Sequence, residues 1–354
     1  MKQVVIIGGG YGGQTVANKL LEQDLPADTR LVLIDRMPFQ GLKTEYYALA
    51  AGTVSDLDIR VPFPVDPRLT VRYGEITGVD LDRKLVLLDQ DDPVPYEYLV
   101  LALGCVDKFH GIPGADQYTQ TIQTLSATRR TYQALNDVRP YGQVTIVGGG
   151  LSGVELASEL RESRPDLNIR LLDRGPRILS HFPEGLSRYV HQWFTEHHVE
   201  LVSNVSVSRV EQGVVYNREQ PIVTDVTVWT AGIQPSPIVQ ALQLPKDPAG
   251  RLIIDAYHQL PDYPGVFIVG DCASLPHSPS GQLAQHQGAQ VAEVLQAIWK
   301  GTTPHLKKIR LRGMLGSLGK KAGFGVMGKS TVMLGKVPRL LKSGVLWKSK
   351  RHFG

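Results

Sequence analysis

Residues 2–13 read KQVVIIGGGYGG and decide the expected fold of the first part of the chain. The apolar run 4–7 is typical of a parallel strand buried on both faces of a sheet. Gly8, Gly10 and Gly13 follow in a GxGxxG pattern, and an apolar helical stretch comes after them. These glycines permit a tight turn, a close approach of a pyrophosphate and close helix–strand packing, so the segment predicts the start of a Rossmann domain.

The next apolar run, residues 31–34, ends at Asp35, which lies 22 residues after Gly13. A carboxylate at this place accepts hydrogen bonds from a ribose diol. The N-terminus of the preceding helix offers free N–H groups and a positive dipole end to phosphates. We therefore interpret residues 4–35 as a dinucleotide-binding unit rather than a glycine-rich turn with a purely structural role.

The same pattern recurs 140 residues later. An apolar run at 144–147 is followed by a second set of glycines, a helical segment at 154–160 and a strand-like run at 169–172 that ends in an acid. The residues of this second fingerprint are Gly148, Gly150, Gly153 and Asp173.

Two dinucleotide sites in one chain suggest two different dinucleotides: FAD held permanently, and NADH or NADPH bound reversibly. Asp173 would repel a 2′-phosphate and so favours NADH. Arg174 and Arg177 lie near it in the sequence and could weaken this preference.

Five segments, GGGYGG, YLVLALG, GGGLSGVELASEL, VWTAGIQPSP and VFIVGDCASL, resemble the flavoproteins with two dinucleotide-binding domains in the pyridine nucleotide-disulfide oxidoreductase superfamily. Among these they most resemble type II NADH dehydrogenases, over roughly residues 1–300. The resemblance implies an α/β protein with two Rossmann-like domains. Residues 1–108 and 255–300 would form a split FAD-binding domain, residues 109–254 an inserted NADH-binding domain, and residues 301–354 a basic C-terminal segment.

The resemblance also implies roles for individual residues. Glu155 would lie near the contact of nicotinamide and flavin, although a glutamate in a first helical turn also has an ordinary helix-dipole role. Gln282 and Gln287 would form the wall on the quinone side. In the flavin domain, Gly104 closes an apolar strand, Gly270 would let the backbone approach the cofactor, and Asp271 would bind its ribityl or pyrophosphate region.

The cysteines limit the redox chemistry. Cys105 and Cys272 are far apart and form no CxxC or zinc-like spacing, so we expect no disulfide framework and no structural metal. Disulfide reductases of this superfamily need a redox-active cysteine pair, and sulfide oxidation needs paired cysteines that carry sulfur. The sequence therefore favours a reaction in which the cofactors do the redox work.

Charge is distributed unevenly along the 354 residues. From Lys300 onward there are 14 Lys and Arg and no acidic residue, whereas residues 1–299 carry 24 basic residues against all 34 acidic ones. On a helical projection Val337, Leu340, Leu341, Val345 and Trp347 share one side, and Arg339, Lys342 and Lys350 fall opposite them. A basic, partly amphipathic helix is typical of an interfacial membrane anchor. A solvated tail, or one that docks on the acidic body, stays open, and nucleic acid binding is less favoured.

No run approaches the length of a spanning helix, and the chain starts directly in a strand with no secretory leader. We therefore expect a cytoplasmic protein, peripheral on the inner face of the cell membrane. The leading functional hypothesis is oxidation of NADH with two-electron transfer from FADH2 to a membrane quinone, without proton pumping. One alternative is a soluble NAD(P)H-dependent reductase that serves a protein such as ferredoxin, or oxygen. Another is a flavin-bound sensor or assembly protein with little turnover, and a homodimer is compatible with each.

Overall fold

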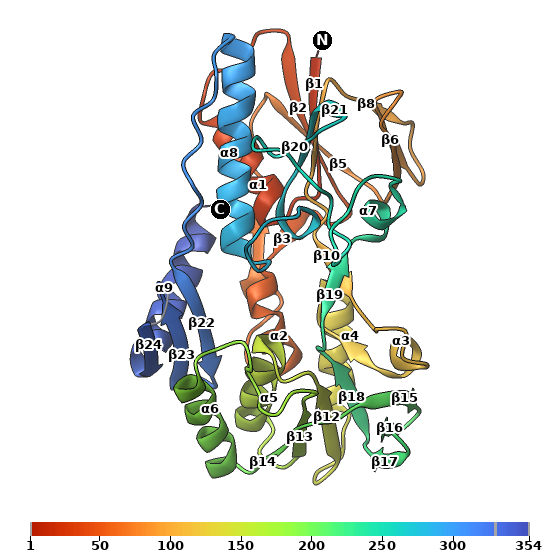
Figure 1. The fold of residues 1–354 in the computed structure, drawn as a ribbon, viewed down its shortest axis with the longest axis vertical. Helices are drawn as coiled ribbons and strands as arrows, with labels where there is room; N and C mark the ends of the chain where they lie inside the picture. The colour runs from red at the N-terminus through yellow and green to blue at the C-terminus, as the bar shows by residue number, and fades with distance from the viewer. Residues whose placement is uncertain (1, 329–330, 353–354) are drawn as a thin grey trace.

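The computed structural model describes residues 2–328 and 331–352. Figure 1 shows a first sheet with two helices at one end of the molecule, a second sheet at the other end, and the C-terminal elements beside both. The α/β class with two Rossmann-like sheets, expected from the two fingerprints, is confirmed.

The first sheet has the strand order β20 (Gln259–Leu260), β21 (Tyr263–Ile268), β9 (Tyr98–Leu101), β1 (Lys2–Ile7), β2 (Thr29–Asp35) and β5 (Leu69–Tyr73). Strand β1 pairs in parallel with β2 and β9, and β21 extends the parallel set on the far side of β9. Helices α1 (Tyr11–Leu21) and α8 (Gly281–Lys300) cover one face of this sheet. An antiparallel meander of β6 (Ile76–Asp80), β7 (Leu85–Leu88) and β8 (Val94–Pro95) contributes to the core on the other face.

The second sheet is parallel throughout, in the order β11 (Gln120–Thr121), β18 (Val226–Trp229), β12 (Gln143–Val147), β13 (Asn168–Leu172) and β14 (Val199–Val202). Its helices are α3 (Ala115–Tyr118), α4 (Leu125–Asn136), α5 (Leu151–Ser163) and α6 (Glu184–Glu196). A second antiparallel meander, β15 (Val207–Glu211), β16 (Val214–Asn217) and β17 (Gln220–Val223), packs on the carboxyl ends of β12, β13 and β18.

Short elements join the two domains. Strands β10 (Cys105–Asp107) and β19 (Ile233–Pro235) form an antiparallel pair where the chain leaves the first domain and returns to it. Two pieces of 3₁₀-helix, η1 (Lys43–Glu45) and η2 (Leu57–Ile59), flank helix α2 (Tyr46–Ala50), between the paired strands β3 (Phe39–Gly41) and β4 (Arg60–Pro62). The last short elements are α7 (Pro237–Ala241) and η3 (Gly270–Cys272).

The chain returns to the first domain earlier than the expected boundary at residue 255. Val239 and Leu252 are fully buried and belong to the same core cluster as Val5 and Ile7 of β1. The segment between β19 and β20 therefore packs on the first domain, and the inserted part is shorter than the sequence suggested.

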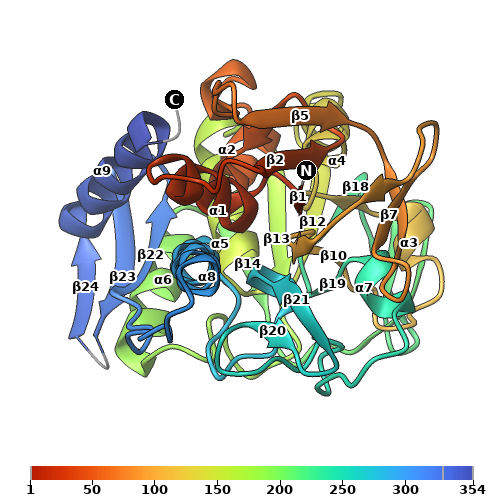
Figure 2. The same cartoon turned by 90° about the horizontal axis from the view of Figure 1, so that it is seen from above.

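The C-terminal residues form a compact piece that we call the C-terminal unit, residues 313–352. It consists of the antiparallel sheet β22 (Gly313–Leu318), β23 (Ala322–Met327) and β24 (Thr331–Gly335), followed by helix α9 (Lys336–His352). Leu318 and Phe324 of this unit are buried in the same cluster as Leu156 and Phe194 of the second domain. Figure 2 shows the unit beside α5, α6 and α8, so it is an integral part of the fold.

Among the described residues, no helix is long and apolar enough to cross a membrane. Cys105 and Cys272 are both buried and free.

Candidate active site

The first fingerprint has the backbone geometry that its glycines require. Gly8 has φ +96°, and a Cβ there would lie 2.5 Å from the carbonyl oxygen of Ala102. A Cβ at Gly13 would lie 2.0 Å from the carbonyl oxygen of Gly8, so helix and turn can approach this closely only without a side chain. Gly10 is different, because no heavy atom lies within 4 Å of its Cβ position and the residue faces a cavity. The turn is therefore packed on one side and open on the side where a pyrophosphate would bind.

The second fingerprint repeats this geometry. Gly148 has φ +114°, and a Cβ at Gly153 would lie 2.0 Å from the carbonyl oxygen of Gly148. Gly150, like Gly10, has open space at its Cβ position and faces the same cavity. Helices α1 and α5 both begin without a side-chain cap, which leaves N–H groups at each N-terminus for an anion.

The two acids of the fingerprints hold equivalent positions. Asp35 accepts hydrogen bonds from the N–H groups of Gly9 (2.6 Å) and Met37 (2.8 Å). Asp173 accepts from Gly149 and Gly175, both at 2.7 Å. Each carboxylate is thereby fixed at the end of its strand, beside the glycine turn. Burial raises the pKa of Asp35.

A single cavity of about 880 Å³ joins the two fingerprints. Gly8, Gly10 and Asp35 line it on the side of the first domain, and Gly150 and Glu155 on the side of the second. It continues to the C-terminal unit, which contributes Leu315 and Lys342 to the wall. The cavity reaches both glycine turns, and the open space at the Cβ positions of Gly10 and Gly150 leaves room there for the pyrophosphates of two dinucleotides.

The strand ends of the first domain line the middle of this cavity. Gly104, Gly270 and Asp271 all line it, and their predicted role in binding the cofactor stays a prediction. The sequence did not single out Lys43, which also lines the cavity and whose Nζ lies 3.4 Å from the carbonyl oxygen of Cys105. Burial raises the pKa of the Cys105 thiol to about 12, which makes this thiol a poor nucleophile near neutral pH.

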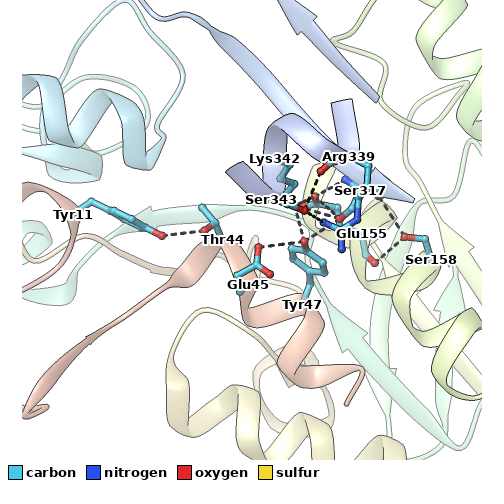
Figure 3. A network of polar contacts seen from close by, with 10 residues as sticks. All are labelled: Tyr11, Thr44, Glu45, Tyr47, Glu155, Ser158, Ser317, Arg339, Lys342 and Ser343. Atoms are coloured by element: carbon cyan, nitrogen blue, oxygen red, sulfur yellow. Dashed lines mark hydrogen bonds and ion pairs between the residues drawn. The ribbon is translucent and has the colours of Figure 1, made fainter. Parts of the chain in front are cut away.

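Glu155 lies at the centre of a buried polar network (Figure 3), which we call the Glu155 network. Its Oε1 accepts hydrogen bonds from the N–H of Ser317 at 2.9 Å, from the hydroxyl of Ser317 at 3.1 Å and from the ammonium group of Lys342. The side chains of Glu155 and Lys342 are 6% and 9% exposed. This is a buried ion pair between the helix of the second fingerprint and the C-terminal helix.

Each hydrogen of the Lys342 ammonium group has an acceptor. Besides Glu155, Nζ donates to the hydroxyl of Tyr47 at 2.6 Å and to the hydroxyl of Ser317 at 3.3 Å. Nζ also lies 4.4 Å from the centroid of the Tyr47 ring. Burial of a charged pair stabilises a structure only when such additional bonds satisfy the ions. The C-terminal unit is therefore fixed to the cavity wall by a fully bonded cation.

Glu45 extends the network away from the cavity. It is 6% exposed, and the hydroxyl of Tyr47 donates to its Oε1 at 3.4 Å. Burial raises the pKa of Glu45 to about 7; Lys342 lowers it and Glu155 raises it further. Burial also raises the pKa of Tyr47 well above 10.

The two predicted glutamines lie on α8 but outside the cavity wall. The Oε1 of Gln282 accepts from the N–H of Arg312 at 3.0 Å, and that of Gln287, which is fully buried, accepts from the N–H of Gly270 at 2.9 Å. Gly281 and Ala284 of the same helix face the cavity instead. Gln287 thus supports the Gly270–Asp271 turn, and a direct catalytic role for either glutamine stays a prediction.

These features define a protein in which two nucleotide-binding domains share one reaction cavity. A family model described as pyridine nucleotide-disulphide oxidoreductase matches residues 2–292, and the chain belongs to this family. It is therefore a pyridine-nucleotide flavoprotein oxidoreductase, a class that binds FAD and NAD(P)H.

Particular relatives agree with this class. The chain is 52% identical to the NADH dehydrogenase-like protein YutJ of Bacillus subtilis, over the full length of both chains. It is 24% identical to a type II NADH:quinone oxidoreductase of Staphylococcus aureus, over 95% of this chain and 94% of the other. The fold is similar to that of NDH2 from Plasmodium falciparum in complex with NADH, with a TM-score of 0.83 at 16% identity, over 99% of this chain and 96% of that one.

Proposed function

We propose that this protein oxidises NADH through bound FAD and passes two electrons to a quinone at a membrane surface, without pumping protons. The observation that carries the proposal is the continuity of the cavity, which runs from both glycine turns to a wall formed by the C-terminal unit at Leu315 and Lys342. Besides the two sides at the glycine turns, this wall gives the cavity a further side at which a second electron acceptor would bind. The names of the relatives from Staphylococcus aureus and Plasmodium falciparum support the same reading.

When bound, FAD would supply the redox chemistry, namely hydride acceptance and two-electron transfer. The protein would position the two nucleotides and supply charge on the cavity wall. Gly10 and Gly150 let pyrophosphates approach the N-termini of α1 and α5. The N-terminus of α8 at Gly281, together with Lys43, places positive charge on the cavity wall where negative charge develops during the reaction.

The proposal favours NADH over NADPH. Asp173 holds a carboxylate beside the second glycine turn, and its charge would repel a 2′-phosphate. Arg177 cannot readily compensate, because its guanidinium donates to the carbonyl oxygens of Leu179, Ser180 and Phe182. The arginine is committed to shaping the loop after β13.

Helix α9 supports attachment to a membrane. Its apolar residues are exposed by 43–71%: Val337, Leu340, Leu341, Val345 and Trp347. Its basic residues Arg339 and Lys342 point the other way, toward the Glu155 network. A helix that turns its apolar side outward is suited to the interface of a bilayer.

Exposed basic side chains elsewhere in the C-terminal part add an electrostatic attraction. They are Lys307, Lys308, Arg310, Arg312, Lys320, Lys321 and Lys336. Each contributes on the order of 1 kcal/mol near an anionic surface. We therefore propose a peripheral position on the inner face of the cell membrane, where a lipid-soluble quinone is available.

An anaerobic two-step experiment tests the function. The flavin-loaded protein is mixed with NADH and bleaching of the flavin is followed, and a quinone analogue is then added. Rapid bleaching followed by prompt return of colour is the expected result. Bleaching without return on addition of quinone, but with return on addition of a ferredoxin or oxygen, would replace the quinone reductase with the soluble reductase. No bleaching would favour a flavin-bound sensor.

A further inference from the structure

A short row of buried groups leads from Glu45 to the cavity. Tyr47 lines the cavity, whereas Glu45 lies behind the wall in η1. The Tyr47 hydroxyl lies 3.4 Å from Oε1 of Glu45 and 2.9 Å from the hydroxyl of Ser317, and it accepts a hydrogen bond from Lys342 at 2.6 Å. One hydroxyl group thus connects a carboxyl that water barely reaches with the place where a substrate binds.

Burial favours a protonated Glu45 carboxyl near neutral pH and raises its pKa to about 7, while the charges around it act in opposite directions. Helix α9 contributes the cations Lys342 and Arg339, and α5 contributes the carboxyls Glu155 and Glu159. All three hydrogens of the Lys342 ammonium group already have acceptors in Glu155, Tyr47 and Ser317. Lys342 therefore acts on Glu45 through its charge alone, without a hydrogen bond to it. Burial disfavours the ionised form of Glu45.

We propose that Glu45 holds a proton that is delivered through the Tyr47 hydroxyl to the second substrate in the cavity. The inference rests on the proposed quinone reductase activity and names the protein groups that complete it. Glu45 acts through Tyr47, which is the group that faces the substrate.

The balance of the reaction requires one such proton. NADH, a quinone and one proton give NAD⁺ and a quinol, so the hydride carries both electrons and one of the two hydrogens that the quinol gains. For the second hydrogen, the O–H bond of Tyr47 breaks as an O–H bond forms on the quinone oxygen. The O–H bond of Glu45 breaks in turn as its proton moves to the Tyr47 oxygen. The Glu45 carboxylate, which is 6% exposed, then takes up a proton from the solvent.

The neighbouring cation helps this transfer. The Lys342 ammonium group lies 2.6 Å from the Tyr47 oxygen, so it stabilises the negative charge that forms there while the proton is in transit. The same contact fixes the orientation of the hydroxyl. Tyr47 is therefore placed as a general acid whose proton is replaced from Glu45.

The first test is the pH dependence of flavin reoxidation by a quinone analogue after anaerobic reduction with NADH. In the wild type the rate is expected to fall as the pH rises through about 7, because Glu45 then loses its proton. Glu45→Gln and Tyr47→Phe are expected to react at least roughly tenfold more slowly below pH 7 and to lose this step, since a general acid contributes about 10²–10⁴-fold. Reduction by NADH itself should change little in either variant.

Glu159→Gln is the matched control. Glu159 is 2% exposed and is influenced by the same two cations, but its hydrogen-bond partner is Thr53 rather than Tyr47. The control is expected to keep the pH step of the wild type. Persistence of the step in both Glu45→Gln and Tyr47→Phe would overturn the inference, as would its equal loss in Glu159→Gln.

A second readout needs no turnover. Infrared spectroscopy of the flavin-loaded protein should show a protonated-carboxyl band that disappears with a midpoint near pH 7 and is missing from Glu45→Gln. An unchanged band in that variant would overturn the assignment to Glu45. If quinone fails to reoxidise the wild-type flavin at any pH, the proposed function fails, while the infrared result still decides whether Glu45 holds the proton.

Discussion

The ion pair between Lys342 and Glu155 makes a quantitative prediction about the C-terminal unit. Replacing Lys342 by Met keeps most of the apolar stem but leaves the Glu155 carboxylate, 6% exposed, without its cation. Loss of one partner of a buried pair costs about 3–5 kcal/mol, because the remaining charge is uncompensated. In Lys342→Met the Tyr47 and Ser317 hydroxyls also lose a donor.

The cost should appear as opening of α9 rather than as unfolding of the whole chain. Both domains keep their own sheets and cores, whereas α9 contacts them mainly through this network and the sheet β22–β24. A loss of about 3 kcal/mol corresponds to hydrogen exchange of the α9 amides that is roughly 100-fold faster. Hydrogen-exchange mass spectrometry measures this directly, with the strand amides of β1 as an internal reference.

A double-mutant cycle decides whether the pair is the cause. Glu155→Gln removes the buried charge, so the double variant Glu155→Gln with Lys342→Met should recover much of the protection that Lys342→Met loses. Strictly additive effects of the two changes would refute the reasoning. Wild-type exchange rates in Lys342→Met would refute it as well.

Three further outcomes are expected. Burial raises the pKa of Glu45 from its ordinary 4.5 to about 7, so the unfolded chain releases a proton between these values that the folded protein keeps. The urea stability of the wild type relative to Glu45→Gln should therefore fall by about 3 kcal/mol as the pH rises through this window and stay low above pH 7; a constant difference would contradict it. Leu340→Glu should weaken sedimentation of the protein with anionic vesicles. Val223→Glu should not, although Val223 on β17 is as exposed as Leu340 (71% each). Equal losses in the two variants would rule out α9 as the anchor. Asp173→Asn should reduce the ratio of kcat/KM for NADH to that for NADPH by roughly tenfold or more, because one repulsive charge is lost. Steady-state kinetics with both nucleotides measure this ratio, and an unchanged ratio would contradict the assignment.

The two domains could be predicted from local sequence because a Rossmann fingerprint is a local device. The turn at Gly8, Gly10 and Gly13 needs nothing beyond its own strand and helix, and the acid at Asp35 bonds back to the same turn. The same holds for the second fingerprint. Placement of Glu155 at the cavity also follows, since its position in the first turns of α5 fixes the direction of its side chain.

The C-terminal unit could not be predicted in the same way. Strands β22 and β23 are rich in glycine, which weakens any strand pattern, and their pairing buries Phe324 and Leu318 against the second domain. The partners Lys342 and Glu155 are 187 residues apart, and Ser317 and Glu155 are 162 apart. No spacing within the sequence indicates such contacts, so docking of the basic segment on the acidic body stayed one alternative among several and its partners could not be named.

Helix α9 exposes its apolar side and buries Lys342, so it can contact a membrane and the cavity at the same time. Its exposed apolar side, with Leu340 71% exposed, is the side available to a bilayer, while Lys342 on the opposite side completes the cavity wall. In the proposed membrane-bound enzyme, the contact with lipid and the contact with Glu155 act on the same rigid helix. Lipid that holds α9 in place would also hold the ammonium group beside Tyr47, and detachment of the helix would leave Glu155 uncompensated. It follows that anionic vesicles should slow hydrogen exchange in α9 and speed quinone-dependent reoxidation together, and that Leu340→Glu should remove both effects. If vesicles accelerate reoxidation while α9 exchanges as fast as in solution, the helix is not the link between the membrane and the site.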